Sequence, residues 1–301
     1  MKSWYSKNRQ LLLRLIGTAL AVSLLAFLLY KEGWADIVDA VTKIPTQYLV
    51  TAALIVFLSR FFVIGRWHIL LRSAGIDIKF SSTTSITFTG LFASNFLPTT
   101  IGGDVVRLSV VIQMGFDRAI SLASLAADRL IGMFGMAMVV PVGLIPLWRW
   151  SSGQTLQSAV FGSLWRRGYN FARRTFQSFS IWLKNPKALF GSLACTWGHM
   201  LCTFAAAFLL IQGMGGNISF WLVAGIYSVT YFVTLLPISI NGYGVQELSL
   251  SYLMVHIGGM DMASGLALAV LIRAAFLIAS LPGAAFLPRT MADMDRSRIG
   301  S

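Results

Sequence analysis

Long apolar runs separated by short polar breaks extend along nearly the whole chain. The first run, 11–30, is about 20 residues long, the length of helix that crosses a hydrocarbon layer of ~30 Å. Further runs lie at about 48–65, 81–97, 101–115, 119–147, 188–212, 218–237, 243–257 and 262–287. Inside lipid every backbone polar group must find its partner within the chain, which favours helices. The pattern therefore predicts an all-α fold, a polytopic integral membrane helical bundle with about eight transmembrane segments.

The first apolar run could be a signal peptide or a membrane helix. Lys2, Lys7 and Arg9 precede it and Arg14 lies near its start, and Lys31-Glu32-Gly33-Trp34 follows it without a small-x-small cleavage site. A run of about 20 residues is also longer than the apolar part of most signal peptides. We interpret 11–30 as an uncleaved first helix with its N-terminus in the cytoplasm.

Two of the apolar segments, 101–115 and 243–257, are too short to span a membrane easily. Each follows a Leu-Pro pair and a glycine cluster, with Pro98 before the first and Pro237 before the second. Proline removes a backbone donor and glycine permits a tight turn. These segments are predicted to be broken or re-entrant helices.

The two Leu-Pro sites also resemble each other in the residues that come after them. The stretch from Leu97 to Asp104 matches the stretch from Leu236 to Gly244 at an offset of 139 residues. An acidic residue follows each break, and an arginine lies in the N-terminal half of the next long segment: Asp104 with Arg129, and Glu247 with Arg273. We predict one transmembrane domain over 1–301 with a duplicated unit, repeat one at about 48–147 and repeat two at about 188–287. Discontinuous helices at matching positions indicate a substrate site between the repeats.

Composition and charge support a membrane location. Hydrophobic residues make up 56% of the chain and charged residues only 12%, about half the usual share. The net charge of +13 does not indicate nucleic acid, because the basic residues lie at the ends of apolar runs rather than in one groove. The positive-inside rule places the N-terminus, 66–79, 148–187 and 289–298 in the cytoplasm. Both termini inside would require an even number of crossings, so at least one of nine segments should fail to cross.

The segment 148–187 is a basic interfacial stretch that differs from the rest of the chain. Seven arginines and lysines alternate there with aromatic residues, and no acidic residue occurs between Asp128 and Glu247. Such a segment can lie in the headgroup plane and gather anionic lipid, or it can be a cytoplasmic loop that only sets topology. The sequence leaves both interpretations open.

Ionisable residues within the apolar segments are the candidate functional groups, since each costs ~3 kcal/mol at a helix centre and needs a partner. Asp104 and Arg107 are three residues apart and can pair, whereas the adjacent Asp128 and Arg129 need partners elsewhere. A cross-pair between repeats, Glu247 with Arg129 or Arg107, is a further hypothesis. These groups could be structural ion pairs that hold the broken helices together. Alternatively, the arginines could bind an anionic headgroup while an acidic residue relays a proton or charge. Arg60, Arg66 and Arg72 are better explained as snorkelling anchors at the cytoplasmic boundary.

Catalytic and metal-binding patterns are weak. The three histidines lie on separate segments, and Cys195, His199 and Cys202 on one helical stripe lack a second ligand pair. The glycines at 213–216 are not followed by the Lys-Ser/Thr of a phosphate loop. No catalytic residue, metal or cofactor is predicted.

Together these motifs resemble a known family. Asn95-x-x-Pro98, Gly102-Gly103-Asp104-x-x-Arg107, Asp128-Arg129-Leu130 and Pro237 followed by Gly242-x-Gly244-x-x-Glu247 are similar to the transmembrane region of lysylphosphatidylglycerol synthases. The resemblance covers about 45–287. It implies a multi-pass protein of a bacterial or archaeal cytoplasmic membrane that moves a lipid between leaflets.

One departure argues against the enzymatic activity in that family's name. The resemblance implies that aminoacyl transfer belongs to a soluble C-terminal domain, and this chain ends at Ser301, shortly after the last apolar run. We expect no such domain here, and so a protein more akin to a flippase than to an enzyme. The resemblance also implies that the position of Asp104 holds a glutamate as often as an aspartate.

The sequence therefore predicts a translocator of a membrane lipid, such as an aminoacylated phospholipid, a polyprenyl-linked glycolipid or a hopanoid-type lipid. Alternatives are a lipid-modifying membrane transferase with Asp104 or Glu247 as base, and a non-catalytic partner of such an enzyme. The expected partners are membrane lipids with an anionic or lipid-linked headgroup, and no nucleic acid. The sequence predicts neither the direction nor the energy source of transport, nor the oligomeric state of the protein. The candidate substrate-binding residues are Asn95, Pro98, Gly102, Gly103, Asp104, Arg107, Asp128, Arg129, Pro237, Gly242, Gly244, Glu247 and Arg273.

Overall fold

The computed structural model describes residues 34–97, 102–151, 185–236 and 241–286, with Ser239 and some positions between 15 and 30. Regular structure in these residues is entirely α-helical, which confirms the predicted fold class for this part of the chain. Most of the predicted first helix, the basic stretch from 152 to 184 and both prolines of the two breaks, Pro98 and Pro237, lie outside the described residues.

Four helices are long and apolar enough to cross a membrane: α3 (Thr46–Ser73), α6 (Arg118–Ser151), α9 (Pro186–Gly213) and α12 (Met262–Ser280), whose apolar run continues to Phe286. A helix of 28 residues, as in α3 and α9, extends about 42 Å. Large apolar side chains such as Leu54, Phe190 and Ile278 are more than half exposed on these helices. Such surfaces suit lipid rather than water, and the chain is a multi-pass membrane protein.

Polar caps mark where several helices begin. Asn185 precedes α9 and its side chain accepts a hydrogen bond from the backbone N–H of Ala188, with Pro186 at the first helical position. Asp261 accepts from Ser264 at the start of α12 in the same way. These contacts satisfy backbone donors that the helix itself leaves free. These caps fix the starts of α9 and α12.

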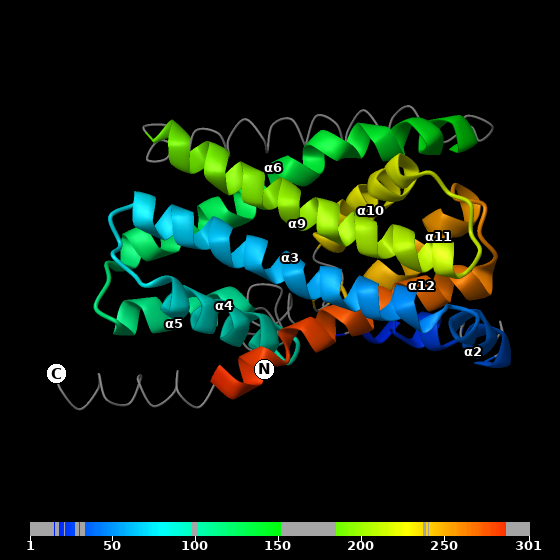
Figure 1. Ribbon diagram of the computed structural model, residues 1–301, viewed down its shortest axis with the longest axis horizontal. Coiled ribbons are helices and arrows are strands. Elements are labelled where there is room, and N and C mark those ends of the chain that lie inside the picture. The colour runs from blue at the N-terminus through cyan, green and yellow to red at the C-terminus, as the bar shows by residue number, and fades with distance from the viewer. Residues whose placement is uncertain are drawn as a thin grey trace, which may run out of the picture.

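The remaining helices between the long ones are short and lie in pairs. α4 (Phe80–Ser94) packs on α5 (Gly102–Gln113), and α10 (Phe220–Thr234) packs on α11 (Val245–His256). The 12-residue helices α5 and α11 extend only about 18 Å. Both pairs turn back near the middle of the molecule (Figure 1). The segments expected to be too short to cross are therefore short helices in hairpins.

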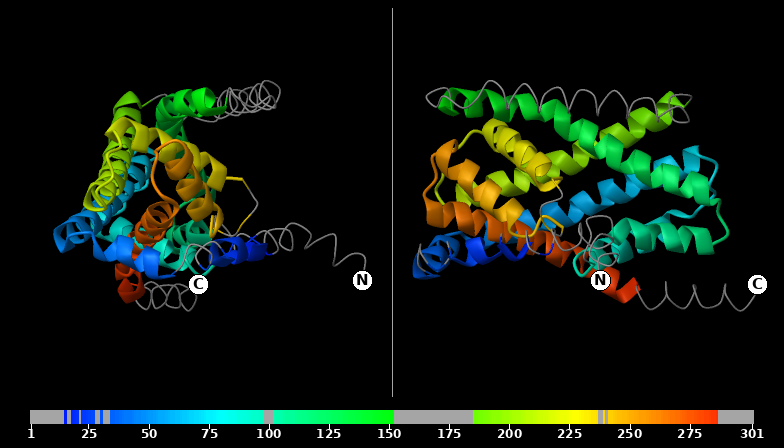
Figure 2. Two further views of the ribbon diagram at one scale, coloured as in Figure 1. Left: turned by 90° about the vertical axis from the view of Figure 1, so that its right-hand side faces the viewer. Right: turned by 180° about the vertical axis from the view of Figure 1, so that it is seen from behind.

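The order of helix lengths recurs along the chain. Helices of 28, 15 and 12 residues, α3, α4 and α5, are followed after α6 by α9, α10 and α11 with the same lengths. α3 and α9 lie side by side and run in opposite directions, because Gly213 near the end of α9 contacts Ile44 and Tyr48, while Gly191 near its start contacts Ile69. The first hairpin opens toward one end of the bundle and the second toward the other (Figures 1 and 2).

Each half of the chain packs its last long helix on the hairpin of the other half. α6 meets α10 so closely that a Cβ on Gly143 would lie 2.3 Å from the carbonyl oxygen of Gly225. Beyond α12, a Cβ on Gly283 would lie 2.0 Å from the carbonyl oxygen of Phe88 in α4. Only glycine permits backbones to approach in this way. The two halves are therefore interlocked rather than laid end to end.

The buried apolar residues form one large cluster and smaller satellites. The large cluster joins α3, α6, α9, α10, α11 and α12, and a second cluster surrounds Trp67 between α3, α4, α5 and α6. α2 (Trp34–Thr42) packs Ile37 and Ala40 against Leu266 and Ala267 of α12. The Trp67 cluster lies directly beside buried charged side chains of α5 and α6.

The borders of the basic stretch 148–187 do not lie where the sequence predicts. α6 continues to Ser151, and α9 begins at Pro186. These two borders lie at opposite ends of the bundle (Figures 1 and 2). The prediction of a stretch 148–187 held wholly on one side of the membrane does not fit this placement, because charge counting from sequence does not register that α6 runs the full length of the molecule.

The glycine contact between α6 and α10 can be tested by Gly143→Ala. The added methyl group would overlap the Gly225 carbonyl, so the helices must separate, and we expect a loss of about 1–3 kcal/mol. Thermal unfolding in detergent measures the change. Gly191→Ala is the matched control, because its Cβ would meet only Ile69 at 3.4 Å, and alanine is the better helix former. Equal melting temperatures for the two variants would contradict the proposed close contact.

Candidate functional site

The start of α5 places Asp104 among arginines. α5 lies against α4 where a Cβ on Gly103 would come within 2.4 Å of the Gly90 carbonyl oxygen, so both positions need glycine. Asp104 lies in the first turn of α5, and its Oδ1 accepts from Arg107 Nη1 at 3.2 Å. Its Oδ2 accepts from Arg129 Nε of α6. The predicted pairing of Asp104 with Arg107 is confirmed.

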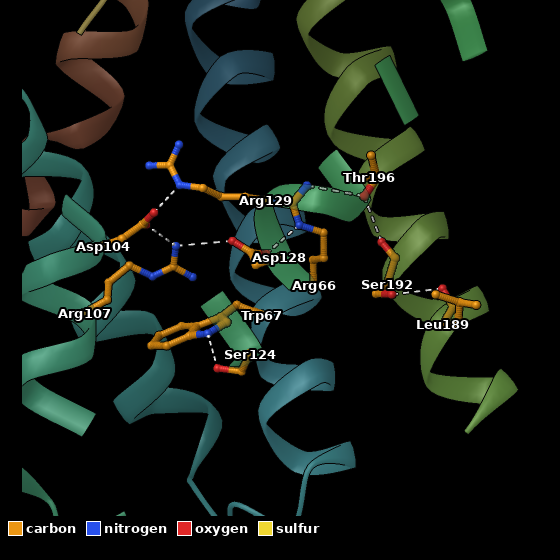
Figure 3. A network of polar contacts seen from close by, with 10 residues as sticks. All are labelled: Arg66, Trp67, Asp104, Arg107, Ser124, Asp128, Arg129, Leu189, Ser192 and Thr196. Carbon is orange, nitrogen blue, oxygen red and sulfur yellow. Dashed lines mark hydrogen bonds and ion pairs between the residues drawn. The ribbon is translucent and has the colours of Figure 1, made fainter. Parts of the chain in front are cut away.

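Asp128 is the most enclosed carboxylate of this group, with 2% of its surface exposed. Its Oδ1 accepts from Arg66 Nε at 2.6 Å and its Oδ2 from Arg107 Nη1 at 3.3 Å. Arg107 thus bridges Asp104 and Asp128, as Figure 3 shows. Asp128 and Arg129 point to different partners, as their adjacency in the helix predicts. We call these five residues, Arg66, Asp104, Arg107, Asp128 and Arg129, the first charge cluster.

Polar and aromatic contacts fix the first charge cluster in place. Arg66 Nη1 donates to Thr196 Oγ1 of α9 at 3.3 Å. The guanidinium of Arg107 lies 4.0 Å above the Trp67 ring, and Trp67 Nε1 donates to Ser124 Oγ of α6 at 3.3 Å (Figure 3). The first charge cluster therefore connects α3, α5, α6 and α9. Even so, Arg107 Nε and Nη2 are buried without a hydrogen-bond partner among the described residues.

The second hairpin carries a smaller pair. Asn241, Gly242 and Gly244 all have positive φ, which forms the turn before α11 and suits glycine at two of the three positions. Glu247 in the first turn of α11 is 4% exposed and accepts from Arg273 Nε of α12. Arg273 also lies 4.7 Å above the Tyr243 ring. We call Glu247 and Arg273 the second charge cluster.

The hypothesis that Glu247 pairs with Arg129 or Arg107 is wrong. Each carboxylate of the two matching positions pairs instead with the arginine of its own half, Asp104 with Arg129 and Glu247 with Arg273. The two pairs have nearly equal separations along the chain, 25 and 26 residues. Glu247 Oε2 is buried without a hydrogen-bond partner in the described part of the chain.

Hydrogen bonds also join the two halves at the tips of the two hairpins. Tyr243 Oη donates to the carbonyl oxygen of Asn95 at 3.3 Å, and Asn241 Nδ2 donates to the carbonyl oxygen of Ser94 at 3.2 Å. Asn95 Nδ2 donates to Ser280 Oγ of α12 at 2.9 Å. The predicted residues Asn95, Gly242 and Gly244 therefore lie at or next to one junction between the hairpins.

The interpretation of three arginines as snorkelling anchors holds for only one of them. Arg72 is exposed and pairs with Asp77 at 3.1 Å near the end of α3. Arg66 is buried and paired with Asp128, and Arg60 is buried in the middle of α3. The position of Arg60 within its apolar segment could have indicated its burial. It is about 20 Å from either end of α3, too far for its side chain to reach the membrane surface.

Metal ligation finds no support in the described residues, where no group of three or more histidine, cysteine or acidic side chains is arranged to hold an ion. Cys195 and Cys202 are both free thiols.

The described helices define a multi-pass helical membrane protein with ion pairs at the first turns of two short helices. Within that class, residues 14–283 match the family described as the lysylphosphatidylglycerol synthase TM region, and the chain belongs to that family. No curated protein matches the chain.

The central position of Asp128 predicts a large stability effect for Asp128→Asn. The change would remove the negative charge that compensates the positive charges of Arg66 and Arg107. Breaking a buried ion pair costs about 3–5 kcal/mol. Thermal unfolding in detergent measures it, with the exposed Asp77→Asn as the control that should change little. If both variants unfolded at the wild-type temperature, Asp128 would not hold these helices together.

Proposed function

We propose that the protein translocates a lipid between the leaflets of a bacterial cytoplasmic membrane. The observation that carries this proposal is a set of buried charged atoms beside the hairpin tips that have no hydrogen-bond partner among the described residues: Arg107 Nε and Nη2, and Glu247 Oε2. Unsatisfied charged atoms in a low-dielectric interior are costly and usually reflect a function. A polar headgroup that passes between the hairpins would supply their hydrogen bonds.

The proposal also takes the two halves to be a duplicated unit in inverted orientation. The recurring helix lengths, the antiparallel α3 and α9, and the matching pairs Asp104–Arg129 and Glu247–Arg273 support this. Hairpins that enter from opposite sides and meet at their tips are a known basis for alternating access. The headgroup would move along the tips while the acyl chains stay in the bilayer.

Transferase chemistry has less support, because a general base needs a carboxylate free to take a proton. Asp104 and Asp128 each contact two arginines, and Glu247 contacts one. These contacts occupy both oxygens of Asp104 and of Asp128. The ion pairs are better suited to binding and releasing a charged headgroup than to proton abstraction.

A reconstituted leaflet-exchange assay tests the proposal. Fluorescent lipids are placed in proteoliposomes, and the fraction accessible to an impermeant quencher is followed with time. Wild type should accelerate exchange, and Glu247→Gln should slow it by about tenfold or more, since a charge-assisted hydrogen bond contributes ~1.5–3 kcal/mol.

Asp77→Asn is the control, because its carboxylate is exposed and lies just before α4, whose length of about 22 Å separates it from the first hairpin tip. An absence of exchange by wild type for every lipid tested would remove the translocator proposal. A transferase would be recognised by a chemically altered lipid, and a non-catalytic partner by the lack of both activities.

We propose further that the end of the bundle near Arg72, Lys79, Arg118 and Lys187 faces the cytoplasm, as do both termini. The opposite end carries α2, which contains Asp36 and Asp39, and the start of α12, which Asp261 caps. Basic residues favour the cytoplasmic side.

Single cysteines at 77 and 261, in a variant without Cys195 and Cys202, test this orientation. An impermeant maleimide added to intact cells should label Asp261→Cys and spare Asp77→Cys. Labelling in the reverse pattern would contradict the assignment.

A further inference from the structure

Arg60 differs from the other arginines of the interior. It lies in the middle of α3 and is 8% exposed, and its guanidinium lies 4.4 Å above the ring of Phe276 in α12. Its Nε is buried without a hydrogen-bond partner, and no carboxylate among the described residues pairs with it. Arg66, Arg107, Arg129 and Arg273 each contact a carboxylate.

An unpaired guanidinium at this depth is unfavourable in the unliganded protein. A cation–π contact offsets only part of the free energy that burial of an ion costs. Arg129 is exposed, so four arginines stand beside three carboxylates in the described interior, which leaves an excess of one positive charge. The interior therefore has capacity for an anion.

The surroundings of Arg60 connect the two charge clusters. Tyr227 of α10 is close enough to Arg60, Arg273 and Glu247 to interact electrostatically with all three. On the other side, His199 of α9 lies within electrostatic range of both Arg60 and Arg66, and its Nδ1 is buried without a partner in the described part of the chain. Arg60 thus lies between the first and the second charge cluster, with a second unsatisfied polar atom beside it.

We infer that Arg60 binds the phosphate of the translocated lipid, and that the lipid has a net negative headgroup. A planar guanidinium with several donors matches phosphate oxygens, and a phosphodiester would compensate the positive excess. An aminoacylated lipid with more ammonium groups than phosphates would increase that excess, and an uncharged lipid would not change it. This inference rests on the proposed translocation and narrows it to one substrate class.

Three lipids with the same fluorescent acyl chain and different headgroups test the inference in proteoliposomes. Phosphatidylglycerol is net negative, phosphatidylcholine is zwitterionic and lysyl-phosphatidylglycerol is net positive. Wild type should exchange phosphatidylglycerol several-fold faster than either of the others. Equal rates for the net negative and net positive lipids would overturn the inference while leaving translocation intact, whereas no exchange of any lipid would overturn translocation itself.

Arg60→Gln should slow phosphatidylglycerol exchange about tenfold and reduce the preference for it. Arg72→Gln is the matched control on the same helix, since Arg72 is exposed and paired with Asp77, and it should leave both the rate and the preference unchanged. Arg60→Lys keeps the charge without the planar set of donors, so its exchange rate should fall between those of wild type and Arg60→Gln. Unchanged phosphatidylglycerol exchange in Arg60→Gln would overturn the assignment.

Stability separates a binding role from a structural one. Because Arg60 is an unpaired buried charge, Arg60→Gln should unfold in detergent at or above the wild-type temperature. A lower melting temperature, together with wild-type exchange by Arg60→Lys, would show that Arg60 acts through its packing on Phe276 and would overturn the inference.

A last experiment distinguishes a lipid headgroup from free phosphate as the ligand of Arg60. Radiolabelled inorganic phosphate outside the vesicles should not accumulate inside them and should not slow lipid exchange. Arg60-dependent uptake of inorganic phosphate would identify a soluble anion as the ligand and overturn the assignment to a lipid.

Discussion

Asp128 is the group on which the arrangement of the first half depends. It is almost fully enclosed, and its two oxygens accept from arginines of two other helices, Arg66 of α3 and Arg107 of α5. In a low-dielectric interior such a charge is tolerated only with close partners. Those partners in turn bring Asp104, Arg129, Trp67 and Thr196 into register. A short hairpin that cannot cross a membrane by itself is thereby tied to three long helices.

Glycine contacts provide the second constraint on the fold. Gly143 against Gly225 and Gly283 against Phe88 allow the last long helix of each half to rest on the hairpin of the other half. Without a hydrophobic driving force between helices in lipid, close packing of backbones is one of the main sources of association. The interlocked halves place the two hairpin tips against each other, where Asn241 and Tyr243 donate to the backbone carbonyls of Ser94 and Asn95. The site is therefore a product of packing between distant segments.

Helix positions and local pairs could be predicted from the sequence because they depend on short spacings. The short segments near 101–115 and 243–257, the pairing of Asp104 with Arg107, and the divergence of Asp128 from Arg129 all follow from helical geometry. The partners of Arg66 and Glu247 depend on which helices meet, and the spacing along the chain does not contain that information. The prediction for Arg60 is wrong because nearness to other basic residues is a weaker guide than distance from the helix ends. The role of these residues in binding a substrate stays a prediction.

The two halves have similar helices but unequal charges. The first hairpin is tied down by five charged side chains and the second by two. If the hairpins loosen in turn to admit a headgroup, loosening the second breaks fewer ion pairs and costs less free energy. An idle translocator of this kind would spend more of its time open on the side of the second hairpin. Such a bias sets how quickly lipid is collected from each leaflet, but without an energy source it cannot change the final distribution of lipid between them.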